Sequence, residues 1–377
     1  MNKSLDRLFA ITAPGLEKVC AVELAALGMA GVRATGGGVE FEGDRRDLYR
    51  GNLWLRTASR VVVRIGTVKS RDFPDLFRKT VRLPWGKYVR PDTRVVVRAS
   101  SHGSRLNHTG RIAATIGEAV DRALGRGGSP EAGPEQLILA RFENDVCLLS
   151  VDSSGELLHR RGYREETARA PLRETLAAGI LMLLGWNGSS ALVDPMCGSG
   201  TFVIEGALIA GNQPPGMRRS FAFMNWPRYR PGLWDALLSE AGKGVQAVSV
   251  PICGSDRDIP TVAAARRNAD RAGVLASIDL QPLELSRRPA PEGRGVFLCN
   301  PPYGERLGRD SDLRPLFRSL GTVFRERFGG WRLAIVCPDE GLAKATGLPL
   351  HKRAVLTNGG IQVFLFSTSG EEKPDSP

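Results

Sequence analysis

The sequence predicts an α/β protein whose C-terminal half forms a mostly parallel sheet ending in an antiparallel hairpin, preceded by an α+β N-terminal half. Three observations lead to this prediction. A glycine-rich turn at residues 198–200 separates a short apolar strand from a helical pattern. A second apolar stretch ends at Asn300. Asn358-Gly359 lies between two strand-like stretches, which is a strong hairpin signal.

The N-terminal half alternates short apolar stretches with helical patterns, and a Gly/Pro-rich break at 125–134 interrupts it. A polar loop, 100–111, carries Arg, His and hydroxyl groups that suit phosphate and ribose oxygens, although it could equally be an ordinary surface loop. We expect strands at 8–11, 38–41, 94–98, 137–141 and 146–151. We expect helices at 16–27 and 111–124, and another that follows the strand at 38–41 and continues into Ala58.

The glycine-rich turn follows an expected strand at 191–194. Gly198 and Gly200 let the backbone approach a ligand and adopt dihedral angles that a side chain would forbid. The third glycine of a dinucleotide fingerprint would fall at Val203 and is absent. The turn fits the methionine end of S-adenosylmethionine better, because the carboxylate of Asp194 suits its ammonium group. A glycine-rich turn by itself is weak evidence.

An expected strand at 248–258 ends in acidic residues and precedes a helix from about 261 to 272. Asp256 could accept both ribose hydroxyls of an adenosine, and Asp258 is the lesser candidate. Alternatively, Asp256 caps the helix, a role that Asp258 could also fill. After a third strand at 277–284, Glu284 is the nearest acid for the adenine amino group, and Asp279 is the poorer one.

Asn300-Pro301-Pro302-Tyr303 follows the apolar strand 295–299. Neither proline can donate a backbone N–H, so the loop offers mostly acceptors beside an aromatic ring, which suits an exocyclic amino group of a nucleobase. Alternatively, the loop is only a turn that ends the strand. A helix at 313–328, a strand at 331–337 and the hairpin at 354–366 complete the arrangement of the S-adenosylmethionine methyltransferases.

These motifs resemble those of the RNA guanine-N2 methyltransferases that carry a THUMP domain. The resemblance rests on segments 194–201, 300–306 and 169–177, and continues upstream through 52–56, 58–60, 98–102, 107–110 and 158–164. It is greatest to the guanine-N2 half of the bacterial 23S rRNA enzymes, and the length of the chain suggests the stand-alone form. It implies a ferredoxin-like domain at 1–65, a THUMP domain at 66–160 and a Rossmann-like methyltransferase domain at 165–370.

The motifs and the resemblance together assign residues to roles. Asn300, Pro301, Pro302 and Tyr303 would be catalytic. The residues expected at the S-adenosylmethionine site are Asp194, Pro195, Cys197, Gly198, Ser199, Gly200, Thr201, Asp256, Arg257, Glu284, Pro171, Leu172 and Thr175. Those expected to bind RNA are Arg105, His108, Arg111, Arg160, Arg161, Arg218 and Arg219.

Charge supports an RNA partner without requiring one. The 377 residues carry a formal net charge of +12, with 27 Lys and Arg against 19 Asp and Glu through residue 165, and 25 against 21 beyond it. The excess could also be a solvated surface rich in Arg. Segment 213–230 interleaves four Arg with aromatic rings; it could stack on a splayed base, or its rings could be buried in packing.

The remaining features point to a reducing compartment. Six cysteines form no C-x-x-C pair, only four histidines are present, and no stretch is apolar enough for a membrane span. We therefore expect no disulfide, no metal and no membrane association, and a cytoplasmic monomer. Three alternatives stay open for function: a tRNA guanine-N2 methyltransferase, an adenine-N6 methyltransferase of nucleic acid, and a non-catalytic RNA-binding protein.

Overall fold

The computed structural model describes residues 5–164, 172–302 and 312–369. The chain divides into two compact units, each with its own seven-stranded sheet. Unit 1 comprises Met1–Thr12, Cys20–Leu158 and Gly216–Glu240, and unit 2 comprises Ala13–Val19, His159–Pro215 and Ala241–Pro377. Unit 1 therefore includes a segment, 216–240, that the sequence analysis placed within the C-terminal domain.

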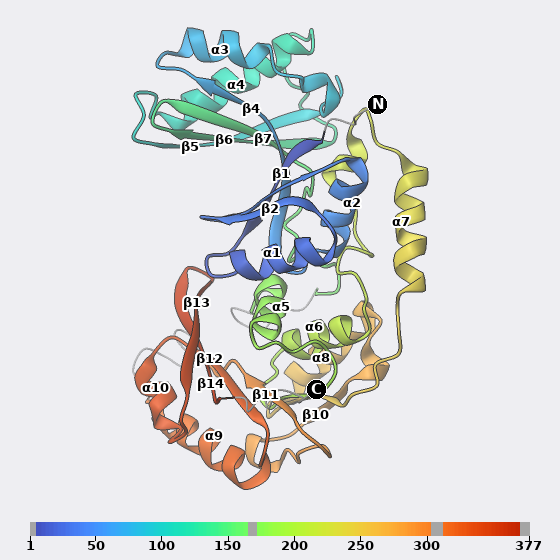
Figure 1. Ribbon diagram of the computed structural model, residues 1–377, viewed down its shortest axis with the longest axis vertical. Helices are drawn as coiled ribbons and strands as arrows, with labels where there is room; N and C mark the ends of the chain where they lie inside the picture. The colour runs from blue at the N-terminus through green and yellow to red at the C-terminus, as the bar shows by residue number, and fades with distance from the viewer. Residues whose placement is uncertain (1–4, 165–171, 303–311, 370–377) are drawn as a thin grey trace, which may run out of the picture. The chain divides into compact units, whose positions relative to one another are not determined.

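The sheet of unit 1 has the order β2-β3-β1-β4-β7-β6-β5, and only β5 and β6 pair in parallel. Helices α3 and α4 lie over one face of β5, β6 and β7 (Figure 1). The strands are β1 (Asp6–Thr12), β2 (Ala30–Thr35), β3 (Gly38–Gly43), β4 (Ala58–Lys69), β5 (Arg94–His102), β6 (Glu135–Glu143) and β7 (Val146–Asp152). The helices are α1 (Glu17–Ala26), α2 (Arg45–Trp54), α3 (Phe73–Val81), η1 (Trp85–Lys87), α4 (Thr109–Ala123), η2 (Ala222–Asn225) and α7 (Pro231–Lys243).

Several expectations for unit 1 are wrong in detail. Helix α2 ends at Trp54 rather than continuing into Ala58, because Ala58 already belongs to β4, which pairs with both β1 and β7. Strands β2 and β4 and helix α3 were not expected from the sequence. The polar loop 100–111 is shorter than expected, since β5 extends to His102 by pairing with β6 and α4 begins at Thr109.

Unit 2 contains the expected α/β sheet, with the order β10-β9-β8-β11-β12-β14-β13. Strands β8 to β12 pair in parallel, and β14 runs antiparallel to β12 and β13, which confirms the predicted fold class. The strands are β8 (Ala191–Asp194), β9 (Ile252–Asp256), β10 (Asp279–Pro282), β11 (Gly295–Cys299), β12 (Arg332–Cys337), β13 (His351–Asn358) and β14 (Ile361–Ser367). The helices are α5 (Glu174–Leu183), α6 (Thr201–Ala210), α8 (Ile259–Ala272), η3 (Leu275–Ser277), η4 (Leu285–Arg287), α9 (Arg314–Arg327) and α10 (Glu340–Ala345).

Alternate residues of the central strands enter two separate cores, one on each face of this sheet. Leu192 and Leu298 pack with residues of α5, α6 and α8, whereas Val193 and Phe297 pack with residues of α9 and α10. Phe297 is fully buried, with its ring centroid 4.6 Å from that of Phe328. This two-sided burial explains why β8 and β11 read as continuous apolar stretches in the sequence.

Two further expectations for unit 2 need correction. The strand expected from residue 248 begins at Ile252, where pairing with β8 begins. The hairpin turn is Gly359-Gly360 rather than Asn358-Gly359, because Asn358 still pairs with Ile361. Both glycines have positive φ, 59° and 87°, as a two-residue turn of this type requires.

Three general properties concern the cysteines, the helices and the possible metal ligands of the described residues. All six cysteines are buried, and none of them forms a disulfide in the described structure. In the part of the chain that the structure describes, no helix combines the length and apolar character needed to cross a bilayer, and no three His, Cys, Asp or Glu side chains gather in a way that could hold a metal ion.

Candidate active site

Three neighbouring parallel strands of unit 2 end in polar residues at the same edge of the sheet. Asp194 is the last residue of β8, Asp256 is the last residue of β9, and Asn300 directly follows β11. The register pairs Asp194 with Gly254 and Val193 with Phe297. Residues far apart in the sequence thus meet where open α/β sheets bind their ligands.

The glycine-rich turn joins β8 to α6 and is held against the end of β9. The backbone N–H of Cys197 donates to the carbonyl oxygen of Ser255 at 2.9 Å, and that of Gly198 donates to Oδ2 of Asp256 at 3.0 Å. Gly198 and Gly200 have φ values of 52° and 87°. A Cβ atom on Gly200 would lie 3.1 Å from that of Ala265, whereas one on Gly198 would meet nothing within 4 Å.

Asp194 supplies a buried carboxylate beneath this turn. Its side chain is 2% exposed, and its Oδ1 accepts a hydrogen bond from the backbone N–H of Met196 at 3.1 Å. Burial raises the pKa of Asp194 well above its ordinary value, and the nearby charge of Asp256 raises it further. A cation bound beside Asp194 would stabilise its ionised form, so the site is suited to an ammonium group.

Asp256 is available for a ligand because its neighbour caps the helix. Asp258 is the N-cap of α8, with its side chain accepting from the backbone N–H of Thr261. The alternative role of Asp256 as the helix cap is therefore wrong. Asp256 is partly exposed and accepts from the backbone of Gly198 and of Asp258.

The remaining residues expected at the cofactor site have mixed surroundings. Pro195, Cys197, Ser199, Thr201, Leu172 and Thr175 are buried, whereas Arg257 and Glu284 are exposed. Glu284 directly precedes η4, and its side chain makes no capping hydrogen bond there. Asp279, in contrast, accepts from Arg288 at 2.6 Å, which leaves Glu284 as the better candidate acid after β10. Pro171 lies outside the described residues.

The loop after β11 contains an acceptor that has no donor among the described residues. The Oδ1 atom of Asn300 is buried and accepts no hydrogen bond from any described residue. Pro301 is buried and Pro302 is partly exposed, while Tyr303 lies outside the described residues. A buried unsatisfied oxygen costs free energy that a hydrogen-bond donor on a ligand would recover.

Buried charges that the sequence analysis did not assign connect the segment before α5 to the glycine-rich turn. Arg164 donates from Nη2 to the hydroxyl of Thr201 at 2.6 Å, and its Nε lies 3.0 Å from Oε1 of Glu174. Tyr163 donates its hydroxyl hydrogen to Oε1 of Glu205 at 3.1 Å. A sequence signal for Glu205 existed, since it is the sole charged residue of the otherwise apolar α6.

The same network changes the interpretation of Arg161. Arg161 was expected to contact RNA, but it is 4% exposed and its Nη2 lies 3.5 Å from Oε2 of Glu205. This burial argues against a direct RNA contact. Arg160, next to it, is exposed.

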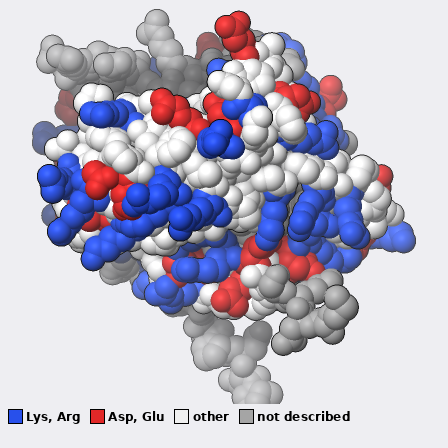
Figure 2. All heavy atoms as spheres, turned by 90° about the horizontal axis from the view of Figure 1, so that it is seen from above, with Lys and Arg blue, Asp and Glu red and all other residues white. Residues whose placement is uncertain are grey.

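The other residues expected to bind RNA lie in unit 1. Arg105, His108 and Arg111 are exposed. His108 also caps α4, because its Nδ1 accepts from the backbone N–H of Arg111 at 3.0 Å. The guanidinium of Arg111 stacks 4.2 Å from the ring centroid of Phe73. Figure 2, seen from the end that carries α3 and α4, shows Lys and Arg gathered on this face with fewer Asp and Glu among them.

In segment 216–240 the aromatic rings are packed inside unit 1. Phe223 stacks on Tyr49 with centroids 4.2 Å apart, and the indole N–H of Trp226 donates to Oε1 of Gln136 at 2.7 Å. Arg218 is exposed, but Arg219 donates to the carbonyl oxygens of Leu157 and Glu156. Most of these rings are therefore buried by packing, which was the alternative to base stacking. Arg219 already donates hydrogen bonds to main-chain oxygens.

Comparisons with known proteins match three consecutive parts of the chain. Residues 7–62 match the model of the RlmL ferredoxin-like domain, residues 70–152 match the THUMP domain, and residues 161–365 match the RMKL-like methyltransferase domain. A Synechocystis protein provisionally named an RNA methyltransferase is 37% identical over 95% of both chains. The ribosomal RNA large subunit methyltransferase K/L of Syntrophotalea carbinolica is 37% identical over 98% of this chain and 55% of its own length.

Solved structures agree with this fold along nearly the whole chain. A protein provisionally titled a methyltransferase, solved in complex with SAH (S-adenosylhomocysteine), superposes with a TM-score of 0.90 at 32% identity, over 98% of this chain and 99% of its own. A Listeria monocytogenes protein, titled a predicted N6-adenine-specific DNA methylase, gives a TM-score of 0.87 at 32% identity over 96% of both chains. The chain spans about half the length of the K/L relatives that it matches.

The two glycines of the turn should tolerate alanine unequally. Gly198→Ala should lower the free energy of unfolding of unit 2 by about 1–2 kcal/mol, the usual cost of a left-handed backbone for a side chain. Gly200→Ala should cost roughly 1–3 kcal/mol more, because its Cβ atom would crowd Ala265. Chemical denaturation monitored by tryptophan fluorescence would measure both, and equal losses would contradict the 3.1 Å approach at Gly200.

Proposed function

The chain belongs to the RMKL-like methyltransferase family, with a ferredoxin-like and a THUMP domain before the methyltransferase domain, and on this basis we propose that it transfers a methyl group from S-adenosylmethionine to the exocyclic N2 of a guanine in 23S rRNA. The family, the THUMP domain and the K/L relatives support RNA as the substrate class. The site at the ends of β8, β9 and β11 would carry out the transfer.

The single observation that carries the chemistry is the buried Oδ1 of Asn300, which accepts no hydrogen bond from the described residues. An exocyclic amine is a donor, and the prolines at 301 and 302 add no backbone N–H that would compete for this oxygen. A nucleobase amine would satisfy an acceptor that the fold leaves without a donor.

The residues before this loop fit the cofactor. Asp194 would bind the ammonium group, and Asp256 would accept hydrogen bonds from the ribose hydroxyls. The positive φ of Gly198 and Gly200 would let the backbone of the turn lie close to the cofactor. Glu284 would meet the adenine amino group. When bound, S-adenosylmethionine supplies an electrophilic methyl group on a sulfonium.

The residues of the chain would act mainly by alignment. The side-chain oxygen of Asn300 and the main-chain oxygen of Pro301 would accept from the guanine amine and aim its lone pair at the methyl group. Tyr303, if it stacks on the base, would hold the ring in place. An amide is no general base, so the rate would come from orientation and electrostatics. The C–N bond would form as the bond between the methyl carbon and sulfur breaks, which leaves a thioether, and the amine proton would then pass to water.

The proposal assigns the substrate from the K/L relatives, whose names specify large-subunit rRNA. A tRNA guanine is the nearest alternative. Adenine N6 is a second candidate, because the same acceptor suits any exocyclic amine and the Listeria structure has that title. The cytoplasmic location and the monomeric state expected from the sequence stay predictions.

Product analysis distinguishes these substrates. The protein would be incubated with S-adenosylmethionine labelled on its methyl group and with either naked 23S rRNA or tRNA, and the RNA digested to nucleosides. We expect labelled N2-methylguanosine from 23S rRNA. N6-methyladenosine, label in tRNA alone, or no product from either RNA would contradict the proposal.

Asn300→Ala should abolish methyl transfer while changing the dissociation constant of S-adenosylhomocysteine by less than about threefold. It should also leave the free energy of unfolding nearly unchanged, because no described residue donates to the oxygen that is removed. The control is Asn268→Ala, which removes a buried amide bonded to Ser199 and Arg271 and should cost about 1–3 kcal/mol. Equal loss of cofactor binding and transfer in Asn300→Ala would mean that the loop has another role.

Cofactor affinity should fall as the pH falls. The raised pKa of Asp194 means that this carboxyl becomes protonated, and loses its attraction for an ammonium group, at a higher pH than an ordinary aspartate. Calorimetry with S-adenosylhomocysteine should show affinity decreasing about tenfold per pH unit below that pKa. Asp194→Asn should bind more weakly and lose this dependence, and an unchanged pH profile in the variant would contradict the assignment.

A further inference from the structure

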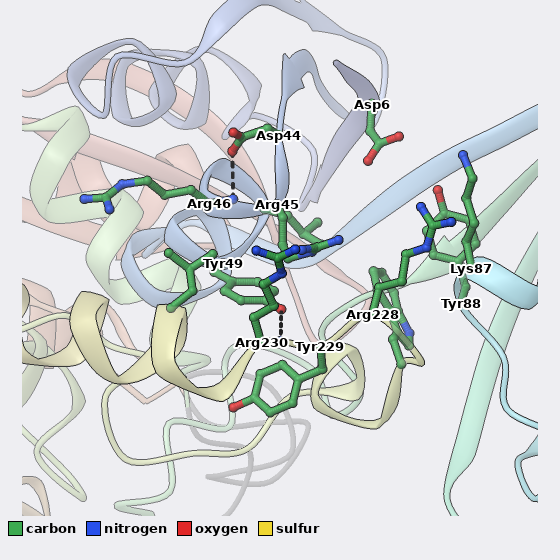
Figure 3. A pocket seen from close by; sticks show the side chains of 13 residues that line it. Asp6, Asp44, Arg45, Arg46, Tyr49, Lys87, Tyr88, Arg228, Tyr229 and Arg230 are labelled. Atoms are coloured by element: carbon green, nitrogen blue, oxygen red, sulfur yellow. Dashed lines mark hydrogen bonds between the residues drawn. The ribbon is translucent and has the colours of Figure 1, made fainter. Parts of the chain in front are cut away.

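Unit 1 contains a cavity of about 570 Å³, which is lined in part by residues 226–230 of the Arg-rich, aromatic segment 213–230. Segment 226–233, the start of β1, the beginning of α2 and the η1 turn form its walls (Figure 3). Its volume is in the range of pockets that hold small ligands. The cavity therefore has room for a nucleotide.

The walls carry more positive charge than the fold neutralises. The five cationic residues that line the cavity are Arg45, Arg46, Lys87, Arg228 and Arg230. Arg46 extends away from the others and pairs with Glu240 at 2.6 Å. Among the described residues, no carboxylate lies within ion-pair distance of the other four.

The two carboxylates of the cavity offset only part of this charge. Asp44 is the N-cap of α2 and accepts from the backbone N–H groups of Arg46 and Asp47. Asp6 interacts electrostatically with Lys87, Arg45 and Arg228, so one carboxylate faces three cations. The four cations outnumber the two carboxylates and repel one another, and a bound anion would relieve that repulsion.

Aromatic rings complete the cavity. Tyr88 and Trp226 are buried and meet edge to face with centroids 5.0 Å apart, which makes a rigid wall. The ring of Tyr229 is partly exposed and lies 5.9 Å from that of Tyr49. Packing accounts for the buried rings, whereas Tyr229 presents a surface on which a base could stack. Cations beside an accessible ring are what proteins use to bind single-stranded nucleic acid.

We propose that this cavity binds a phosphate-bearing nucleotide of the RNA substrate, separate from the nucleotide that is methylated. The inference rests on the proposed function in that it takes RNA as the ligand. Arg45, Lys87 and Arg228 contact the phosphates, and Tyr229 stacks on the base. A free nucleotide shares this chemistry, and the experiment separates the two sources.

The first test removes three of the unpaired charges. In the full chain, Arg45→Gln, Lys87→Gln and Arg228→Gln are combined, and binding of a fluorescein-labelled single-stranded RNA of about ten nucleotides is followed by anisotropy over a range of salt concentrations. The control combines Arg318→Gln, Arg327→Gln and Lys344→Gln, which are exposed cations of α9 and α10. Both variants lose the same net charge.

We expect the cavity variant to bind RNA at least tenfold more weakly at low salt, with the slope of log affinity against log salt reduced by roughly 1–2. The α9/α10 variant should stay within about twofold of the unchanged protein. Equal affinities and slopes in the two variants, or no RNA binding by the unchanged protein, would overturn the proposal. Circular dichroism melting curves establish that both variants are folded.

Two further experiments test whether Tyr229 stacks on a base and whether the ligand is RNA or a free nucleotide. Tyr229→Ala should weaken RNA binding about tenfold, whereas Tyr229→Phe, which keeps the ring, should not. Calorimetry with 5′-UMP tests a free nucleotide. If UMP binds the unchanged protein and is lost in the cavity variant while RNA affinity is unaffected, the cavity serves a free nucleotide and the proposal is wrong.

These readouts do not depend on turnover. If the unchanged protein binds RNA and the cavity variant does not, but no methylated guanosine forms, the cavity assignment stands and the proposed function fails. If methylated guanosine forms at the same KM for RNA in the cavity variant and the control variant, the function stands and the cavity assignment fails.

Discussion

The parallel pairing of β8 with β9 on one side and β11 on the other is the constraint on which the candidate active site depends. It places Asp194, Asp256 and Asn300 at one edge of the sheet although they lie far apart in the chain. A shift of one residue in either register would turn the apolar side chains of that strand to the opposite face, away from the core they fill. The two apolar cores therefore fix the position of the chemistry.

Buried ion pairs support the glycine-rich turn that follows β8. Glu174 and Glu205 are nearly inaccessible to water, and each is placed beside an arginine of segment 161–164. Breaking such a pair by removing one partner typically costs about 3–5 kcal/mol, because the other charge stays buried. Residues 161–164 therefore support the glycine-rich turn, whereas Arg161 was expected to contact RNA.

Segment 216–240 keeps only part of the role that its composition suggested. Its aromatic rings stabilise unit 1 by stacking with Tyr49 and bonding Gln136, so most of them are not available to a base. The arginines that flank those rings, Arg228 and Arg230, are placed at a cavity together with Lys87. A segment inserted into the sequence of the methyltransferase domain thus completes a basic surface in the other unit.

The sequence by itself determined the α/β class, the strands that carry Asp194 and Asn300, and the glycine-rich turn, because each depends on local periodicity and on the backbone freedom of glycine. Only the tertiary structure decided which polar groups have partners. Packing between distant segments buries Arg161 against Glu205 and leaves the oxygen of Asn300 without a donor among the described residues. The structure also shows that Asp258 is the residue that caps α8. No local pattern encodes such contacts, since a side chain's free energy of burial depends on neighbours that the fold supplies.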